Sequence, residues 1–350
     1  MAWSEPGLSP HSPALSPGER TAAVEAVIGV PVEGQARFNK VLVDQVEESW
    51  QRDVVPVLRK AWPQMLQLPY LKKLRAGFET YTSLGLSIVV CSRTRPGWLR
   101  AASVLAGQAL MSEETMARWG VRLLPWAFRT LLRAEVRRVA LMGALILVLD
   151  EALDDGLMEL PPGERPDALW AVVQGQRAVG QDVLGAADGL CRAVRAECRD
   201  GEDRARLAVV FEATRRWARE ETDNLLGVPD PLGFCHRRIG ITTSMDMVAW
   251  GVGDVVGDVE RAFLYDVAEL GQMVDDWLDC EKDGRAGRVT PAILGKWTLQ
   301  GIGESFARTQ AMLKQMTEAG GETYPPYVEL VRRTYVTQIQ RMVQILAHHP

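Results

Sequence analysis

The spacing of the apolar residues is the feature that most constrains the fold of this chain. From about Ala36 onward, apolar side chains recur every three or four residues, and Pro or Gly interrupts the runs. This period matches the 3.6 residues per turn of an α-helix, whereas a half-buried strand would alternate apolar and polar residues. We find no convincing run of the alternating kind. The pattern therefore predicts an all-α fold, built as a single large helical bundle.

The same pattern predicts where individual helices lie. It predicts one helix over residues 65–86 that ends at Gly85 or soon after, another over residues 169–194, and a last amphipathic helix over residues 328–346. The longest apolar run covers residues 139–149, and its eleven residues are too few to span a bilayer. We predict a buried helix there and no membrane anchor.

Composition limits the domain organisation and the class of partner. Residues 1–30 are rich in Ser and Pro and lack the basic start and apolar run of a signal peptide, which predicts a disordered leader. Residues 31–350 are predicted to form one domain, since 47% apolar residues can supply a large core. The formal net charge of −5 argues against nucleic acid as a partner. Five scattered cysteines without CxxC spacing indicate neither a disulfide framework nor a zinc site, which favours a cytoplasmic protein.

A row of acidic residues follows directly behind an apolar run near the C-terminal end of the predicted bundle. Asp275, Asp279 and Asp283 are four residues apart, so on one helix they fall close to one face, with Asp276 beside them. Like charges at this spacing repel and destabilise a helix by roughly a few tenths of a kcal/mol per pair. A divalent cation would offset the repulsion, because Mg²⁺ binds through one or two carboxylates together with substrate phosphates. A solvated acidic helix face is the alternative.

A second acidic cluster ends the apolar run of residues 139–149. Asp150 and Asp154 are one turn apart, and Glu151 follows Asp150 directly. Carboxylates at the C-terminal end of a helix interact unfavourably with the negative end of its dipole. A solvated acidic surface therefore explains this cluster less well than it explains the first row. Fraying of the helix into a turn at Gly156 is the alternative.

Basic residues gather at three turns next to predicted helices. They are residues 93–95 with Arg93 and Arg95, residues 237–238 with Arg237 and Arg238, and residues 285–288 with Arg288, and Lys282 lies shortly before the third turn. Guanidinium groups match phosphate oxygens in pairs, and a helix N-terminus adds backbone donors. A solvated basic turn is the alternative at the first of these places. Together with the acidic clusters, the basic turns indicate a site where Mg²⁺ ions hold a diphosphate, and the apolar helices suit an apolar tail and a carbocation.

The two acidic motifs resemble those of a known family. The pattern DExxD at residues 150–154 and the pattern QxxDDxxD at residues 272–279 are similar to the two aspartate-rich motifs of the all-α class I isoprenoid synthase superfamily, and most of all to trans-isoprenyl diphosphate synthases. The segments SRTRP at 92–96 and GRVTP at 287–291 resemble further elements of that family. The likeness covers roughly residues 36–346. It implies a bundle with a central apolar cavity, three Mg²⁺ ions bound with the substrate diphosphate, and a homodimer.

Looser likenesses point to the terpene cyclases of the same superfamily. The segment HRRIGI at residues 236–241 resembles their helix break, whose arginine senses the diphosphate. Asp275, Asp279 and Asp283 can be laid over the metal motif NDxxSxxxE, and Arg332 with Tyr335 over a late Arg-Tyr pair. The resemblance predicts these ligands of Mg²⁺: Asp150, Glu151, Asp154, Asp275, Asp276, Asp279 and Asp283. It predicts Arg237 and Arg238 as catalytic arginines, and further contacts to diphosphate from Arg93, Arg95, Lys282, Arg288, Arg332 and Tyr335. The side chains predicted to line the pocket and set substrate length are Met142, Leu145 and Ile146.

Departures from the chain-elongating family decide which activity the resemblance implies. Ser92 stands where that family has a lysine, an apolar stretch around Met142 stands where it has a polar group, and residues 158–161 replace an Arg-Arg-Gly segment. The second-substrate site therefore lacks several of its groups, while the metal site is retained. We predict a class I terpene synthase that ionises a linear prenyl diphosphate and cyclises or quenches the cation.

Two other functions stay open from the sequence. One is a prenyltransferase that grips its acceptor differently, and the other is a catalytically silent subunit of a prenyl synthase, since Glu151 replaces the second Asp of the first motif. The sequence does not specify the chain length of the substrate or the identity of the product.

Overall fold

All regular structure in the described part of the chain is helical, which confirms the all-α prediction. The computed structural model describes residues 15–29, 33–67, 71–91, 118, 122, 125–154, 157–176, 180–226, 235–253, 256–285, 290–318 and 325–348. The α-helices are α1 (Pro17–Ile28), α2 (Glu33–Ser49), α3 (Val55–Ala61), α4 (Leu71–Cys91), α7 (Arg133–Asp154), α8 (Arg165–Val173), α9 (Val183–Ala196), α10 (Gly201–Leu225), α11 (Cys235–Val252), α12 (Asp258–Leu278), α13 (Cys280–Arg285), α14 (Leu299–Glu318) and α15 (Pro325–His348). A π-helical turn, η1 (Trp50–Val54), joins α2 to α3, and the short 3₁₀ turns are η2 (Pro63–Gln67) and η3 (Pro162–Glu164).

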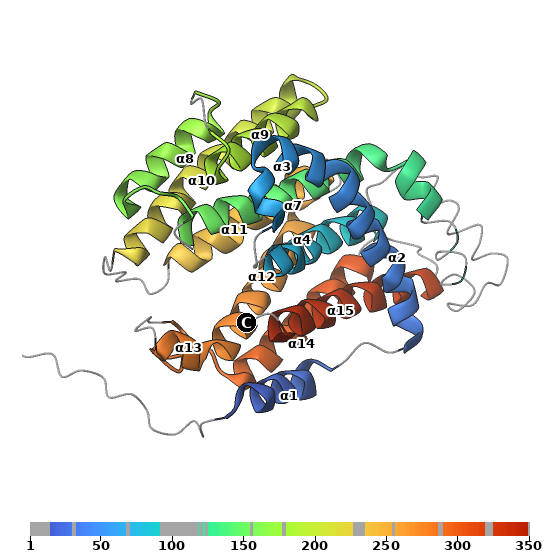
Figure 1. Cartoon of the computed structure of the whole chain (residues 1–350). Helices are drawn as coiled ribbons and strands as arrows, with labels where there is room; N and C mark the ends of the chain where they lie inside the picture. Colours follow the sequence, from blue (N-terminus) through green and yellow to red (C-terminus); the bar gives the residue numbers. More distant parts are fainter. Residues whose placement is uncertain are drawn as a thin grey trace, which may run out of the picture.

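Five long helices form a ring at the centre of the bundle. Helix α4 packs against α7, α7 against α11, α11 against α12, α12 against α15, and α15 against α4 (Figure 1). Helices α8, α9 and α10 cover the α7 and α11 side, whereas α1 and α14 cover the α12 and α15 side. The apolar run at residues 139–149 lies in α7, and all but one of its hydrophobic side chains are buried, as predicted.

Glycines set the close approach of the helices in the ring. A Cβ at Gly85 would lie 2.6 Å from Cγ1 of Val139, and one at Gly143 would lie 2.8 Å from Oγ1 of Thr82. Both glycines face the contact between α4 and α7, so the two backbones can pack more closely than side chains would allow. The predicted end of α4 at Gly85 was wrong, because this glycine serves helix packing and the helix continues to Cys91.

Gly251 makes the corresponding close approach between α11 and α7. We expect Gly251→Ala to lower the free energy of unfolding by about 1–3 kcal/mol, since its Cβ would lie 3.2 Å from Cα of Val139 and 3.5 Å from the carbonyl oxygen of Arg138. Urea unfolding followed by circular dichroism measures the change. Gly18→Ala in α1 is the matched control, because its Cβ meets nothing within 4 Å, and we expect stability to stay the same or rise by up to about 1 kcal/mol. Equal unfolding midpoints for Gly251→Ala and the wild type would contradict the packing argument.

A buried ion pair joins α7 to α10 and α11. Arg138 of α7 donates two parallel hydrogen bonds of 3.0 Å to the carboxylate of Asp203 in α10. Its guanidinium also donates to the carbonyl oxygen of Trp250 in α11, at 2.9 Å, and lies 4.2 Å from the centre of that indole ring. The indole N–H of Trp250 donates in turn to the backbone oxygen of Asp203, at 3.2 Å. The network fixes α7, α10 and α11 relative to one another.

Helix α1 corrects the prediction of a disordered leader over residues 1–30. Ser16 and Glu19 form a capping box, in which the Ser16 hydroxyl accepts from the Glu19 amide and the Glu19 carboxylate accepts from the Ser16 amide, while Pro17 takes the first helical position. Val24 and Ile28 are buried against the core. The Ser and Pro residues near position 16 therefore start a helix, and the prediction was wrong for residues 17–28. Residues 1–14 lie outside the described residues.

Of the helices predicted over residues 169–194 and 328–346, the first prediction was wrong and the second is confirmed. The helix predicted over residues 169–194 is two helices, α8 and α9, because α8 ends at Val173 and Asp182 caps the start of α9 by accepting from the Gly185 amide at 2.8 Å. The last helix, α15, covers residues 328–346 as predicted and extends beyond them at both ends. No helix in the described ranges is long and apolar enough to cross a membrane.

Candidate functional site

The first acidic cluster lies at the C-terminal end of α7. Asp150 is partly buried, whereas Glu151 is only 5% exposed, and the helix ends at Asp154. The side chain of Asp154 lies outside the described residues. The fully buried apolar residues before Asp150 therefore bring at least two carboxyl groups to one end of the central ring.

The second acidic row lies across the end of α12 and the start of α13. Helix α12 ends at Leu278, and Asp279 is its C-cap, so the prediction of one continuous helix was wrong at that residue. The helical hydrogen bonds nevertheless continue, since the Asp279 amide donates to the Asp275 carbonyl and the Asp283 amide to the Asp279 carbonyl, both at 2.9 Å. Asp275, Asp279 and Asp283 thus follow one another at one-turn spacing, as the sequence predicts.

Burial argues against a solvated acidic face. Asp276 is 2% exposed and Asp283 is 6% exposed, and the Asp279 side chain is 17% exposed. Gln272 donates to the Asp276 carboxylate at 2.9 Å, and the exposed Lys282 ammonium lies 3.0 Å from the Asp279 carboxylate. Carboxylates are costly to bury unless they are paired or hydrogen-bonded, so these positions are built into the fold.

Tyr81 of α4 connects the two acidic ends. Burial raises the pKa of the Tyr81 phenol, the negative charges of Asp150 and Asp275 raise that pKa further, and a hydrogen bond with Ser244 of α11 opposes the rise. Both aspartates therefore lie within electrostatic reach of one hydroxyl group. Asp150 of α7 and Asp275 of α12, 125 positions apart in sequence, thus lie near the same side chain, and both helices pack on α11.

The fit of these residues to Mg²⁺ depends on their donor chemistry. In the described part of the chain, no group of three or more His, Cys, Asp or Glu side chains converges as a set of metal ligands. Mg²⁺ usually keeps several waters and takes one or two carboxylates together with substrate phosphates, so a complete protein cage is not required. The oxygen donors at the two helix ends suit Mg²⁺ in that shared arrangement.

Only some of the predicted diphosphate-binding residues belong to the described part of the chain. Arg93, Arg95 and Arg288 lie outside the described residues, as does the side chain of Arg237. Arg238 is exposed in the first turn of α11, and that helix runs without interruption to Val252, so the predicted helix break at residues 236–241 was wrong.

Tyr335 lies away from the acidic ends. Its ring packs edge to face on Phe263, with ring centres 5.1 Å apart and planes at 82°. Phe263 precedes Asp275 by twelve residues, which is about 18 Å along a helix. Arg332, three residues earlier in α15, is partly buried. The structure therefore places Tyr335 in the core near the opposite end of α12.

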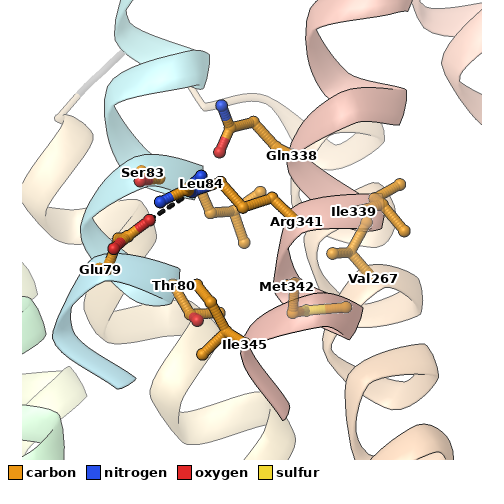
Figure 2. Close-up of a pocket in the computed structure, with 10 residues that line it drawn as sticks. All are labelled: Glu79, Thr80, Ser83, Leu84, Val267, Gln338, Ile339, Arg341, Met342 and Ile345. Carbon is orange, nitrogen blue, oxygen red and sulfur yellow. Dashed lines mark hydrogen bonds and ion pairs between the residues drawn. The ribbon is translucent and has the colours of Figure 1, made fainter. Parts of the chain in front are cut away.

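The predicted pocket residues Met142, Leu145 and Ile146 are fully buried in the core. One hollow lies elsewhere, between α4, α12 and α15, where Arg341 of α15 pairs with Glu79 of α4 (Figure 2). Its volume is about 20 Å³, enough for roughly one water molecule. None of the three predicted pocket residues lines it. These three side chains are packed in the core, so the central cavity that the resemblance implies stays a prediction.

Sequence reasoning missed two residues near the acidic ends, Tyr81 and Ser244, and a third, Arg20, whose guanidinium donates to the carbonyl oxygen of Trp277 at 3.1 Å. Tyr81 belongs to the run Thr80–Ser83, four polar or hydroxyl-bearing residues in a helix that is otherwise largely apolar, and Ser244 belongs to a similar run in α11. A hydroxyl-rich segment facing a core was the signal that could have found both. Arg20 lay in the leader that was excluded from the fold.

Comparison of the chain with family models, with curated proteins and with solved structures finds no match in any of the three.

Proposed function

We propose that this protein is a class I terpene synthase, which ionises a linear prenyl diphosphate and lets the carbocation cyclise or react with water. The observation that carries the proposal is that two acidic helix ends lie near one side chain: the charges of Asp150 and Asp275 both raise the pKa of the Tyr81 hydroxyl. We prefer prenyl diphosphate over other polyanions because the acidic motifs at residues 150–154 and 272–279 resemble those of the class I isoprenoid synthases. The helical architecture is compatible with the proposal and does not by itself select it.

The roles of the residues follow from their chemistry. Mg²⁺ bound with the substrate would supply a Lewis acid for the departing diphosphate. Its proposed ligands are Asp150, Glu151, Asp154, Asp275, Asp276, Asp279 and Asp283. The exposed Lys282 pairs with Asp279, and Arg238 is exposed in the first turn of α11, so both could hold diphosphate oxygens. Arg237, Arg93, Arg95, Arg288 and Arg332 are proposed for the same task, whereas Tyr335 is not, because it packs in the core away from the acidic ends.

Product analysis tests the proposal directly. The purified protein is incubated with Mg²⁺ and prenyl diphosphates of ten, fifteen and twenty carbons, with and without isopentenyl diphosphate. We expect release of inorganic diphosphate and formation of a hydrocarbon or alcohol without isopentenyl diphosphate, and no release with EDTA. A longer prenyl diphosphate formed only when isopentenyl diphosphate is present would instead establish a prenyltransferase.

One observation favours a second candidate, the catalytically silent subunit. Met142, Leu145 and Ile146 are fully buried, so the side chains that should line a prenyl pocket are packed against their neighbours. A subunit that has no substrate to bind can keep such a core closed. Absence of diphosphate release from every prenyl substrate, combined with stimulation of an added prenyl synthase, would support this second candidate.

A further inference from the structure

The N-terminal helix α1 is fastened to the second acidic segment at one end and to α15 at the other. At its C-terminal end, the carbonyl oxygen of Ile28 accepts from Gln340 at 3.2 Å. At the same end, a Cβ on Gly303 of α14 would lie only 2.9 Å from Val27, so α1 and α14 are in close contact. Near its N-terminal end, Arg20 reaches α12. Helix α1 thus packs on α12, α14 and α15.

Arg20 contacts the last turn of α12. Its guanidinium donates to the carbonyl oxygen of Trp277 at 3.1 Å and lies 5.2 Å from the centre of the Trp277 ring. Carbonyl groups in the last turn of a helix have no partner within the helix, and a cation there also interacts favourably with the negative end of the helix dipole. Arg20 therefore stabilises α12 at the turn from which the acidic row continues.

The charge of Arg20 also lies beside the acidic row. The carbonyl group that accepts from Arg20 belongs to Trp277, which follows Asp276 directly and precedes Asp279 by two residues. The guanidinium is therefore held beside the backbone between two acidic residues of the row. The Nε–H of Arg20 is buried and has no hydrogen-bond partner among the described residues, so one donor of this guanidinium is unused.

We infer that Arg20 is a positioning residue for the second acidic segment: it fixes the end of α12 and holds a positive charge beside residues 275–283, where diphosphate would bind. The inference rests on the proposed function, because it assigns a role toward the same ligand. It also makes α1, outside the region that carries the family resemblance, a part of the site. Of the two contributions, the positive charge is the one that only a cation at position 20 can supply.

Binding of inorganic diphosphate in the presence of Mg²⁺, measured by isothermal titration calorimetry on the full chain, tests this role. We expect Arg20→Ala to raise the dissociation constant about tenfold, as is typical for the loss of a hydrogen bond to a charged group. Arg20→Lys keeps the charge and should recover part of the affinity. Arg20→Gln keeps a donor for the Trp277 carbonyl but loses the charge, and should bind as weakly as Arg20→Ala.

A packing variant separates this role from loss of stability. Val24 is fully buried one turn along the same helix, so Val24→Ala weakens the docking of α1 without removing the charge. We expect its affinity for diphosphate to stay within about twofold of the wild type. Wild-type affinity in Arg20→Ala or Arg20→Gln, or equal losses in Val24→Ala and Arg20→Ala, would overturn the inference while leaving the proposed function intact. A wild-type protein that neither binds diphosphate with Mg²⁺ nor releases it from prenyl substrates would overturn both.

Discussion

Asp275→Asn is expected to lower Mg²⁺-dependent release of diphosphate about a thousandfold, a loss typical of removing one well-placed electrostatic group from an active site. Asparagine has nearly the same volume as aspartate, so the variant removes the charge and leaves the end of α12 packed. Asp275 is the most informative of the acidic residues, because its charge and that of Asp150 act on the same Tyr81 hydroxyl. Steady-state release of diphosphate from the best prenyl substrate, measured over a range of Mg²⁺ concentrations, gives the effect.

A matched control lies six residues further on. Glu281 is exposed in α13 and pairs with Arg285 at the surface, so Glu281→Gln makes the same kind of change, acid to amide, on a side chain that faces solvent. We expect less than a twofold change in rate, because exposed ion pairs contribute roughly 0–1 kcal/mol. Equal rates for Asp275→Asn and the wild type would show that the site has been assigned to the wrong residues.

The second large effect concerns stability. Arg138→Ala is expected to lower the free energy of unfolding by about 3–5 kcal/mol, because it removes one partner of a buried ion pair and leaves the Asp203 carboxylate without its bidentate partner. The variant also removes the contact with the Trp250 ring and carbonyl. Urea unfolding measures the loss. Arg285→Ala, which breaks an exposed pair with Glu281, is the control and should change stability by about 1 kcal/mol at most.

The same ion pair gives stability a defined dependence on pH. Burial alone would raise the pKa of Asp203, but the hydrogen bond from the Arg199 amide and the charge of Arg138 outweigh it, so the pKa lies below its usual 3.8. The folded state therefore binds the proton of this group less readily than the unfolded chain does. The contribution of Asp203 is complete above pH 3.8 and is lost as the pH falls through the lower folded-state pKa. Asp203→Asn should flatten the acid side of the stability curve, and an unchanged curve would contradict this assignment.

Local patterns were enough to predict the features that depend on neighbouring residues. The period of the apolar residues predicted the helices, the run at 139–149 predicted the buried α7, and the spacing of Asp275, Asp279 and Asp283 predicted their one-turn succession. Each of these depends on residues within a few turns of one another. The sequence left two interpretations of the acidic row, a metal site and a solvated helix face. The burial of Asp276 and Asp283 argues against the solvated face.

Features that depend on distant contacts could not be predicted. Gly85 carries the sequence signal of a helix end, and only the approach of Val139 shows that it is a packing position. Tyr81 became a candidate site residue because Asp150 and Asp275 reach it from other helices. Arg20 has its partner 257 positions away at Trp277. A single sequence does not show which distant residues contact one another. The roles of basic residues such as Arg20 were therefore the hardest to predict.

The contacts of α1 also have a consequence for the order of assembly. In the described part of the chain, α1 packs on α12, α14 and α15, which are synthesised more than 200 residues after it. Translation proceeds at roughly 5–20 residues per second, so α1 waits on the order of tens of seconds before its docking surface exists. During that interval Val24 and Ile28, which are buried in the folded protein, have none of these helices to pack against. Docking of α1 therefore comes late in folding, and under our inference the second acidic segment reaches its final arrangement only then.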